Sequence, residues 1–588
     1  MKKAVWQAKT NDNIGFLTAN KRGDYVSFFK ENLSRYQGWF VRNDNNLFKI
    51  IESISLTDQE KVLEVKNEFW RFVRKIKTKK GAVEESFFLP KNNRGLVYET
   101  SQAASFDLFL DFKQIFNNNE AERFYKIEIK GKTVIIECSN KQEKIFLAIK
   151  TSSAHILKKE QWVKRFYNLD QQRNSPPFER FVLWALQIRC TKAVFAVGDS
   201  PKKAIEEANL IFKKTWKLKK EKRKELKKSI DWAKLRNQKL AMAYYCAQNS
   251  LGELIFKENG QEYVEAGLPW FFNVYSRDEL ISLKAISQKQ SHVAWRICLE
   301  MLSLIGENGQ LPNKLNEGIS QNADGTGWLF KRIGEQLENK KMNELTVWKI
   351  KKYLEKSLQG LVKSSTNKEL ALCFGADTWM DSIDRPGERI EIQALRLYMF
   401  KLAFELTKKS QYRILEAGLK FKVKEKFWNN NFLFDGSNDQ TIRPNAFLAA
   451  YVYPELLTKK EWQNCFDNIL PALWLDWGGL ATIDKTSPYF NPFHTGEKPQ
   501  SYHSGDSWFY LNNLAALVLY KTNPERYKQY INKILEASAT EILTMGAISC
   551  HAELSSANQL LSQGCFSQAW SSAMFVELIK EIYSTRRT

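Results

Sequence analysis

The chain has 588 residues, of which 43% are hydrophobic and 13% aromatic. This composition excludes an intrinsically disordered chain, and at roughly 150 residues per domain the length predicts several domains. The formal net charge of +23 would suit an anionic partner such as nucleic acid, but no RNP, helix-turn-helix or zinc-finger pattern accompanies it, so we expect no nucleic-acid partner.

Short alternations of apolar and polar residues dominate residues 1–200. Runs of this kind, bounded by Asn, Gly and Lys, are typical of strands, and several at short spacing predict an antiparallel β-sandwich. One patch, at about Asp58–Arg74, has helical spacing and predicts a helix within this region. The clearest predicted strands are Phe124–Lys130, Thr133–Cys138, Lys144–Ile149 and Arg180–Leu186.

The pattern changes near residue 200. Ser200-Pro201 has the chemistry of a helix start, with Ser as the N-cap and Pro in the first turn. The Lys-rich run Lys217–Lys228 follows, and we interpret it as a solvated helical connector. The sequence therefore predicts a charged helical linker over residues 201–230 between an N-terminal β-rich domain (1–200) and a C-terminal domain (231–588).

Amphipathic helical runs dominate residues 231–588 and are separated by long loops rich in Gly, Asn, Asp and Pro, at 306–327, 373–388, 429–445, 476–505 and 546–563. Helices joined by long polar loops predict a scaffold that carries a site on one rim. The predicted helices are Leu235–Ile255, Glu279–Ile305, Thr346–Val362, Ile390–Leu406, Arg413–Phe427, Asp506–Tyr520 and Gly564–Ile582.

The sequence lacks the motifs of several common classes of functional site. The eight Cys include no C-x-x-C pair, and no Walker A loop, H-E-x-x-H helix or G-x-S-x-G elbow is present. His551 beside Cys550 could form a ligand pair only with partners that the sequence does not identify. No stretch approaches about 18 uninterrupted apolar residues, so we expect no membrane span and a cytoplasmic, reduced protein.

The loops carry carboxylates among aromatic residues, namely Asp278, Asp377, Asp381, Glu391 and Glu553. An Asp in a loop commonly forms a turn or caps a helix, so each residue alone is weak evidence. Together they suit glycoside hydrolysis, which needs one protonated and one ionised carboxyl. We expect Asp381, packed against Trp and Met, to have a raised pKa, and Glu553, in a Ser- and Asn-rich loop, to stay better solvated.

Six segments, in order, resemble the glycogen-debranching amylo-α-1,6-glucosidase family. They cover about 310 residues, and T-W-M-D, R-P-N and Q-A-W-S are the most specific matches. The segments are AGLPWFFNVYSRDELISL (266–283), GQLPNKLNEGISQNADGTGWLF (309–330), ADTWMDSIDRPGERIEIQAL (376–395), DQTIRPNAFLA (439–449), SYHSGDSWFYLNNLAAL (501–517) and GCFSQAWSSAMFVELI (564–579).

The resemblance implies an (α/α)6 toroid preceded by a β-rich domain, with an inverting mechanism and no cofactor or metal. It places the general acid at Asp381 and the general base at Glu553, and implies an α-glucan or oligosaccharide substrate. The substrate-binding residues that it implies are Trp270, Arg277, Asp278, Asp324, Trp379, Glu391, His503 and Trp508.

Two departures from the family keep alternatives open. The first segment reads Val-Tyr-Ser-Arg-Asp where the family commonly has Trp-Gly-Arg-Asp. The base loop is longer: counted from Gly546 the expected position holds Ser549 or Cys550, whereas the distance to Gln568 selects Glu553. The chain could therefore be a glucoamylase- or trehalase-like hydrolase of another linkage, or a glycan-binding homologue without activity.

Overall fold

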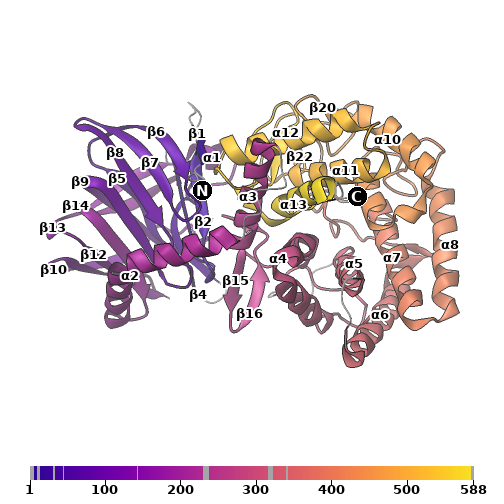
Figure 1. The fold of residues 1–588 in the computed structure, drawn as a ribbon, viewed down its shortest axis with the longest axis horizontal. Coiled ribbons are helices and arrows are strands. Elements are labelled where there is room, and N and C mark those ends of the chain that lie inside the picture. Colours follow the sequence, from indigo (N-terminus) through magenta and orange to yellow (C-terminus); the bar gives the residue numbers. More distant parts are fainter. Residues whose placement is uncertain are drawn as a thin grey trace. The chain divides into compact units, whose positions relative to one another are not determined.

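The computed structural model describes residues 6–8, 14–30, 34–43, 46–141, 143–228, 237–315, 322–338 and 342–584 (Figure 1). The chain forms two compact units: unit 1 comprises Met1–Gln261 with Thr540–Cys550, and unit 2 comprises Glu262–Ala539 with His551–Thr588. The predicted division at residues 200 and 230 differs from these units, because residues 231–261 and the return segment 540–550 belong to unit 1. None of the described helices is long and apolar enough to cross a membrane.

Unit 1 is built on antiparallel strands, as the alternating sequence predicts, and they form two arms that share β9 and β14. The strands of the first arm pair with the start of β9, near residue 95, and with the end of β14, near residue 198. The strands of the second arm pair with the remaining parts of β9 and β14. The first arm has the order β1 (Trp6–Ala8), β6 (Gln59–Asn67), β7 (Phe72–Thr78), β8 (Gly81–Phe88), β9 (Gly95–Gln114), β14 (Glu179–Gly198), β12 (Lys144–Thr151), β11 (Thr133–Ser139) and β10 (Phe124–Lys130).

The second arm continues from the same two long strands in the order β2 (Gly15–Ala19), β3 (Tyr25–Phe29), β4 (Gly38–Asn43), β5 (Asn46–Leu56), β9, β14 and β13 (His155–Phe166). Buried side chains from both arms, such as Phe16, Trp39, Phe87 and Leu147, belong to one hydrophobic core. The burial of these large apolar side chains is the main force that holds the arms together. A short helix, α1 (Asn168–Gln172), lies between β13 and β14 in the sequence.

The predicted helix at Asp58–Arg74 is wrong, because this segment forms the hairpin β6–β7. A register shift between Val62 and Glu64 inserts an irregularity into β6. Val62 and Val65 are therefore both buried although they lie three residues apart, while Leu63 between them is 38% exposed. A bulge of this kind breaks the two-residue alternation and leaves a spacing that resembles a helix.

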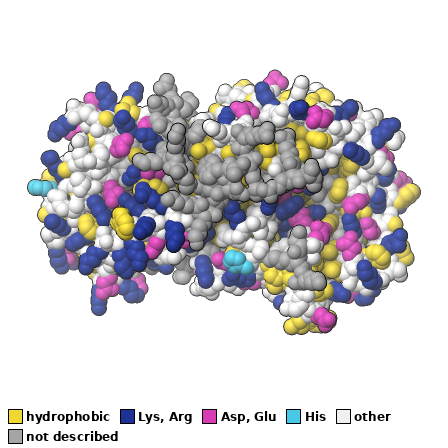
Figure 2. Space-filling view, in the orientation of Figure 1, with side chains coloured by type: hydrophobic (Ala, Val, Ile, Leu, Met, Phe, Trp, Pro, Cys, Tyr) yellow, Lys and Arg dark blue, Asp and Glu magenta, His cyan; other side chains and the backbone are white. Residues whose placement is uncertain are grey.

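Helix α2 (Pro201–Lys228) begins where the sequence predicts, and the Ser200 hydroxyl accepts a hydrogen bond of 3.3 Å from the Lys203 N–H. It is not a free linker, however. Its apolar face, including Ala204, Ala208 and Ile211, packs on β-sheet residues of unit 1. Its lysines remain largely on the other face, and Figure 2 shows a dense group of basic side chains where Figure 1 places α2.

After α2, the described chain resumes with α3 (Gln238–Glu253), β15 (Ile255–Glu258) and β16 (Gln261–Val264). The predicted start of α3 at Leu235 lies outside the described residues. Asn237 caps α3 by accepting a hydrogen bond of 3.1 Å from the Leu240 N–H. Part of the second family-like segment, residues 316–321, also lies outside the description.

Six helices of unit 2 contact one another in a closed ring, in which each contacts the next in chain order and the last contacts the first. They are α4 (Ser276–Leu302), α5 (Gly325–Leu337), α7 (Ile390–Thr407), α9 (Asn445–Val452), α11 (Phe509–Thr522) and α13 (Ala569–Ser584). We call them the ring helices.

The ring helices are buried on nearly all sides, which is expected of helices in the interior of a large domain. All eight residues of α9 are buried, as is every residue of α11 from Phe509 to Leu519. Helix α4 bends at Gln290 (φ −129°, ψ 56°). Its first segment is buried nearly throughout, whereas the second buries only one face, so α4 contributes one inner and one outer segment.

The remaining helices of unit 2 are amphipathic and bury one face. Side chains cap the starts of two of them: Asn343 caps α6, and Thr458 and Glu461 form a capping box on α10, whereas α8 has no side-chain cap. Likewise, α4, α5, α7, α9 and α11 have no side-chain cap. The other helices are α6 (Glu344–Ser364), α8 (Ser410–Phe427), η2 (Pro454–Leu456), α10 (Lys459–Leu473) and α12 (Lys528–Thr544).

Two-residue strands tie the loops together at the starts of the ring helices. β17 (Gly267–Leu268), before α4, pairs with β24 (Ser567–Gln568), directly before α13. β22 (Ser507–Trp508), directly before α11, pairs with β23 (Leu554–Ser555). The others are β18 (Thr366–Asn367), β19 (Leu370–Ala371), β20 (Trp474–Leu475) and β21 (Gly479–Leu480).

Candidate active site

The predicted site residues gather where the ring helices begin. Residues that begin or directly precede different ring helices come into contact there, although they lie far apart in the sequence. Arg277 and Asp278 occupy the first turn of α4, Asp324 directly precedes α5, Glu391 lies in the first turn of α7, and Trp508 directly precedes α11.

Arg277 organises one side of the site. It is buried, and its Nε contacts the two carboxylate oxygens of Asp324 at 2.9 and 2.8 Å. Its Nη1 lies 3.4 Å from Asp381 Oδ2, and its Nη2 donates to the Asp377 carbonyl at 3.3 Å. The rigid, planar guanidinium thereby fixes three acidic positions from two different loops.

Asp381 is the accessible carboxyl of this cluster. Its side chain is 49% exposed, whereas that of Arg277 beside it is 3% exposed. The surrounding protein still displaces enough bulk water to raise the Asp381 pKa, while the Arg277 charge opposes the shift. A carboxyl with a raised pKa and an open face can exchange a proton with a bound molecule.

Glu553 occupies the opposite environment, because only 1% of it is exposed. Burial raises its pKa to about 8, although the Tyr502 hydroxyl donates a hydrogen bond to Oε1 and the Cys565 N–H donates one of 2.9 Å to Oε2. The expectation that Glu553 is the better-solvated carboxyl is therefore wrong. Its Ser- and Asn-rich loop folds inward, where β23 pairs with β22.

Gly564 makes room for the Glu553 carboxyl. A Cβ at this position would lie 2.3 Å from Glu553 Oε2, closer than any side chain can approach. The residue also has a φ of +69°, which favours glycine. The G-C pair of the last family-like segment thus has a geometric explanation: Gly564 admits the carboxyl and the Cys565 N–H binds it.

The charge of Asp278 interacts with both candidate catalytic carboxyls, Asp381 and Glu553. Its pKa is raised to about 7 by burial, with Arg277 opposing and Asp381 adding to the shift. Gln568 Nε2 donates to Asp278 Oδ1 at 3.3 Å. The Asp278 charge also contributes to the raised pKa of Glu553, so the two acids influence each other electrostatically.

An aromatic wall stands beside the carboxyls. Trp379 makes edge-to-face contacts with His503 and Trp508, with ring centroids 5.3 and 5.6 Å apart. His503 stacks on Trp508 at 4.9 Å, and its Nδ1 lies 2.7 Å from the Ser382 hydroxyl. Burial and nearby arginines hold the His503 pKa well below its usual value, so this ring is neutral.

Two predicted substrate contacts occupy other surroundings. Trp270 is 6% exposed and packs edge-to-face on Phe566 at 5.4 Å, in the loop after β17. Glu391 is 3% exposed and accepts a hydrogen bond of 3.1 Å from Arg385, which also binds Asp435. Glu391 thus belongs to an internal ion-pair network, and it also lines a small cavity together with Asp324 and Trp379.

A family model for amylo-alpha-1,6-glucosidase matches residues 239–577, more than half of the chain. The chain belongs to the amylo-α-1,6-glucosidase family. Its members are glycoside hydrolases, so family membership assigns this chain to the glycoside hydrolases. No curated protein matches the chain.

Among solved structures, this member of the amylo-α-1,6-glucosidase family is similar to a bacterial glucoamylase that was solved in complex with acarbose. The likeness covers 99% of this chain and 98% of that chain, with a TM-score of 0.65 and 11% sequence identity. At this identity the comparison establishes a shared fold, with a large antiparallel sheet region followed by a helical region.

The structure adds residues that the prediction did not select. Tyr502, Gln568 and Asn445 all lie inside the family-like segments, but only their contacts reveal their tasks. Their side chains are uncharged, so neither composition nor the spacing of charged residues could mark them as functional among the other residues of each motif.

In this member of the amylo-α-1,6-glucosidase family, hydrogen bonds or ring contacts hold the side chains of His494, His503 and His551. His551 Nε2 lies 3.1 Å from Asn513 Nδ2, and the His551 ring packs on Phe509. Within the described ranges, no group of three or more His, Cys, Asp or Glu side chains is arranged to hold a metal ion.

Proposed function

We propose that the chain removes α-1,6-linked glucosyl branches from glycogen-like glucans by an inverting acid–base mechanism, with Asp381 and Glu553 as the catalytic carboxyls. The observation that carries the proposal is the pair itself. Asp381 is open to a ligand beside a fixed guanidinium, and Glu553 is held by two hydrogen-bond donors within the same charge network. Family membership over residues 239–577 supports the choice of an α-glucan substrate.

We further propose that unit 2 is an (α/α)6 toroid. The closed ring of six buried helices supports this assignment, as does the bend at Gln290, which divides α4 into an inner and an outer segment. In a toroid of this type the inner helices run in the same direction, so their preceding loops form one rim. The site residues at the starts of the ring helices fit that arrangement.

Unpaired polar atoms around the carboxyls support recognition of a sugar. Among the described residues, Gln568 Oε1, Asp377 Oδ1 and Trp570 Nε1 are buried without hydrogen-bond partners. Buried polar groups are costly unless they are paired, so such atoms favour a ligand with many hydroxyl groups. The flat faces of Trp379 and Trp508 stand nearby, and aromatic faces suit the C–H faces of sugars.

In the proposed reaction, Asp381 gives its proton to the glycosidic oxygen as the bond between that oxygen and the anomeric carbon breaks. Glu553 accepts a proton from a water molecule, whose oxygen attacks the anomeric carbon from the opposite face. The donors on both Glu553 oxygens favour its carboxylate form, which the base requires. The products are glucose with inverted anomeric configuration and the debranched glucan.

The decisive experiment measures glucose release from a phosphorylase-limit dextrin by the wild type, Asp381→Asn and Glu553→Gln. Each variant should lose roughly 100- to 10,000-fold in rate, which is the usual contribution of general acid–base catalysis. Glu307→Gln is the control, because the Glu307 side chain is 94% exposed and should not affect the rate. NMR of the first product should show the inverted anomer.

Other outcomes would reassign the function. Release of glucose from maltose but not from isomaltose or the limit dextrin would indicate a glucoamylase-like preference. Binding of dextrin without turnover by the wild type would identify a glycan-binding homologue. We also propose a cytoplasmic location, which suits the eight cysteines, all of which are free thiols.

A further inference from the structure

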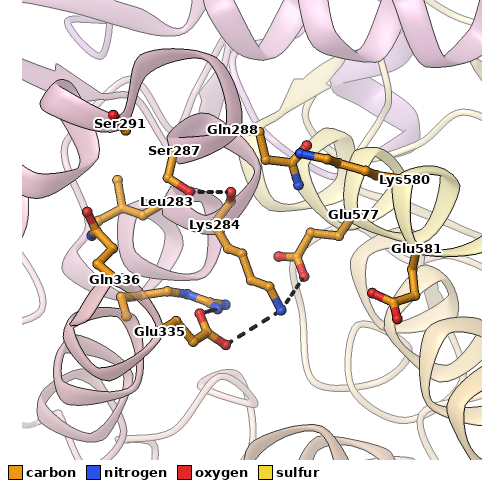
Figure 3. Close-up of a pocket in the computed structure, with 11 residues that line it drawn as sticks. Leu283, Lys284, Ser287, Gln288, Ser291, Glu335, Gln336, Glu577, Lys580 and Glu581 are labelled. Atoms are coloured by element: carbon orange, nitrogen blue, oxygen red, sulfur yellow. Dashed lines mark hydrogen bonds and ion pairs between the residues drawn. The ribbon is translucent and has the colours of Figure 1, made fainter. Parts of the chain in front are cut away.

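Unit 2 contains a second polar cavity, distinct from the carboxyl cluster (Figure 3). It has a volume of about 370 Å³ and lies between α4, α5 and α13. A water molecule occupies roughly 30 Å³ of liquid, and ligand pockets start at about 300 Å³, so the cavity has the size of a small-molecule site.

On each of these three helices, the residues that line the cavity follow those of the candidate active site by several residues. On α4, Arg277 belongs to the active site, whereas Lys284, Ser287 and Ser291 line the cavity. These positions are 7 to 14 residues further along the helix, which corresponds to about 10–21 Å at about 1.5 Å per residue. On α5, Gln336 likewise follows Asp324 by three turns. A ligand in this cavity would therefore not occupy the active site.

A buried ion network forms one wall of the cavity. Figure 3 shows the Lys284 ammonium between the carboxylates of Glu577 and Glu335, at 3.2 and 3.5 Å. Arg332 binds Glu335 at 2.6 Å, and the Tyr451 hydroxyl donates to Glu577 Oε2 at 3.0 Å. The charges of the lining cancel, because three cations face three carboxylates: Lys284, Arg332, Lys580, Glu335, Glu577 and Glu581. This balance disfavours an ionic ligand.

Three residues that line the cavity carry hydrogen-bond acceptor atoms without a donor. Glu577 and Gln336 are 4% and 9% exposed, and the Oε1 atom of each has no partner among the described residues. The Oε1 atom of Gln288, another lining residue, is also buried and unpaired. Three acceptors in a lining without net charge call for a neutral molecule that offers several hydroxyl donors.

A second hollow adjoins the first and shares Lys284 and Glu335 with it. Its volume is about 510 Å³, and its lining includes Tyr451, Trp462 and Val518. The ion pair of Lys284 and Glu335 is thus shared by both hollows, and the second hollow adds aromatic and aliphatic side chains to a lining that also holds lysines and glutamates. Hydroxyl groups and C–H faces occur together on sugars, and the two linings present partners for both.

We propose that the cavity between α4, α5 and α13 is a second sugar site that binds a neutral mono- or disaccharide, whose hydroxyl groups donate to Glu577, Gln336 and Gln288. Its lining residues on α4 lie two to four helical turns beyond Arg277, and the site does not depend on the proposed reaction. Its occupant would add hydrogen bonds to the ends of three ring helices that also carry active-site residues.

Calorimetric titration with maltose tests the proposal in the full-length Asp381→Asn chain, where turnover is suppressed. Two classes of site are expected. Ser291→Phe should fill the cavity and Gln336→Leu should remove an acceptor, so each should weaken one class at least tenfold and leave the other unchanged. Ser303→Phe, at the exposed end of α4, is the matched control and should retain both classes.

The assay separates this proposal from that for the active site. One or two classes of site that survive both cavity variants would overturn the second site. A single class that both cavity variants weaken would support the cavity and would show that the active site does not bind maltose. Glucose release from limit dextrin is measured separately with Ser291→Phe in the wild-type background and should be retained. Failure of hydrolysis by every form, with two maltose sites present, would overturn only the proposed reaction.

Discussion

The indole of Trp379 donates a hydrogen bond of 2.8 Å to the side-chain carbonyl of Asn445. The same Asn445 amide donates to Asp435 at 2.7 Å and lies 3.4 Å from Met380 Sδ. Trp379 and Met380 belong to the T-W-M-D segment and Asn445 to the R-P-N segment. One buried amide therefore links two family-like motifs and positions the loop that ends in Asp381.

Trp379→Phe should lower the free energy of unfolding by about 1–3 kcal/mol, because it leaves the buried Asn445 carbonyl without a donor. Chemical denaturation measures the effect. Trp348→Phe is the control, since Trp348 is 57% exposed. An equal loss in both variants would show that removal of indole surface, and not the hydrogen bond, is responsible.

These contacts show how much of the site the sequence could predict. The motifs select Arg277, Asp324 and Asp381 as site residues, and in the structure Arg277 contacts both of the other two. The solvation of Glu553 could not be predicted, since its partners Tyr502 and Cys565 come from other parts of the chain. Burial of a loop residue is a tertiary property and leaves no local pattern.

The Tyr502 hydroxyl is expected to control the pH dependence of catalysis. As the proposed base, Glu553 must be ionised, so kcat/KM should fall as the pH drops through its pKa of about 8. Tyr502→Phe removes a donor that stabilises the carboxylate and should raise this pKa. A hydrogen bond to a charged group contributes about 1.5–3 kcal/mol, so the acid limb should move up by about one to two pH units.

The pH–rate profiles of the wild type, Tyr502→Phe and the control Tyr489→Phe measure this shift; the Tyr489 side chain is 76% exposed. An unchanged acid limb in Tyr502→Phe would contradict the assignment. If instead the alkaline limb moved, Glu553 would act in its protonated form, and the roles of Asp381 and Glu553 would be exchanged.

Glu279 should make the protein less stable as the pH rises. Burial raises its folded-state pKa to about 8, so the folded chain holds a proton that the unfolded chain has already lost. Its contribution is therefore lost as the pH rises from the unfolded pKa toward 8, at up to about 1.4 kcal/mol per pH unit. Glu279→Gln should remove this slope.

Denaturant titrations between pH 5 and pH 9 compare the wild type with Glu279→Gln and with Glu344→Gln, whose side chain is exposed. The stability difference between wild type and Glu279→Gln should grow with pH in favour of the variant. Parallel curves for all three proteins would show that Glu279 does not carry a raised pKa.

Gly564→Ala should reduce the rate of glucose release about 100-fold or more while the protein still folds. The new methyl group would take the place of the Glu553 carboxyl, which must then move away from Tyr502 and Cys565. Gly387→Ala is a matched control: its φ is +97°, but a Cβ there would meet no atom within 4 Å. Equal losses in both variants would point to backbone strain instead.

The fold could be predicted better than its details. Amphipathic periodicity found α6 and α8, which bury one face, and alternation found strands β10, β11 and β12. The prediction missed α9, which has only eight residues and, being buried throughout, shows no polar face. It also missed α10, although the capping box of Thr458 and Glu461 was a readable signal in the sequence.

The uncapped starts of α4, α5, α7, α9 and α11 have an electrostatic consequence. The first N–H groups of a helix give its N-terminus a partial positive charge, and a capping side chain would quench it. Asp278 lies in the first turn of α4 and Asp324 directly precedes α5, so the positive ends of these two helices lie beside acids of the site. The backbone itself can thus compensate negative charge that Arg277 alone would not balance, and a developing positive charge on a substrate would meet acids held in place by helix ends.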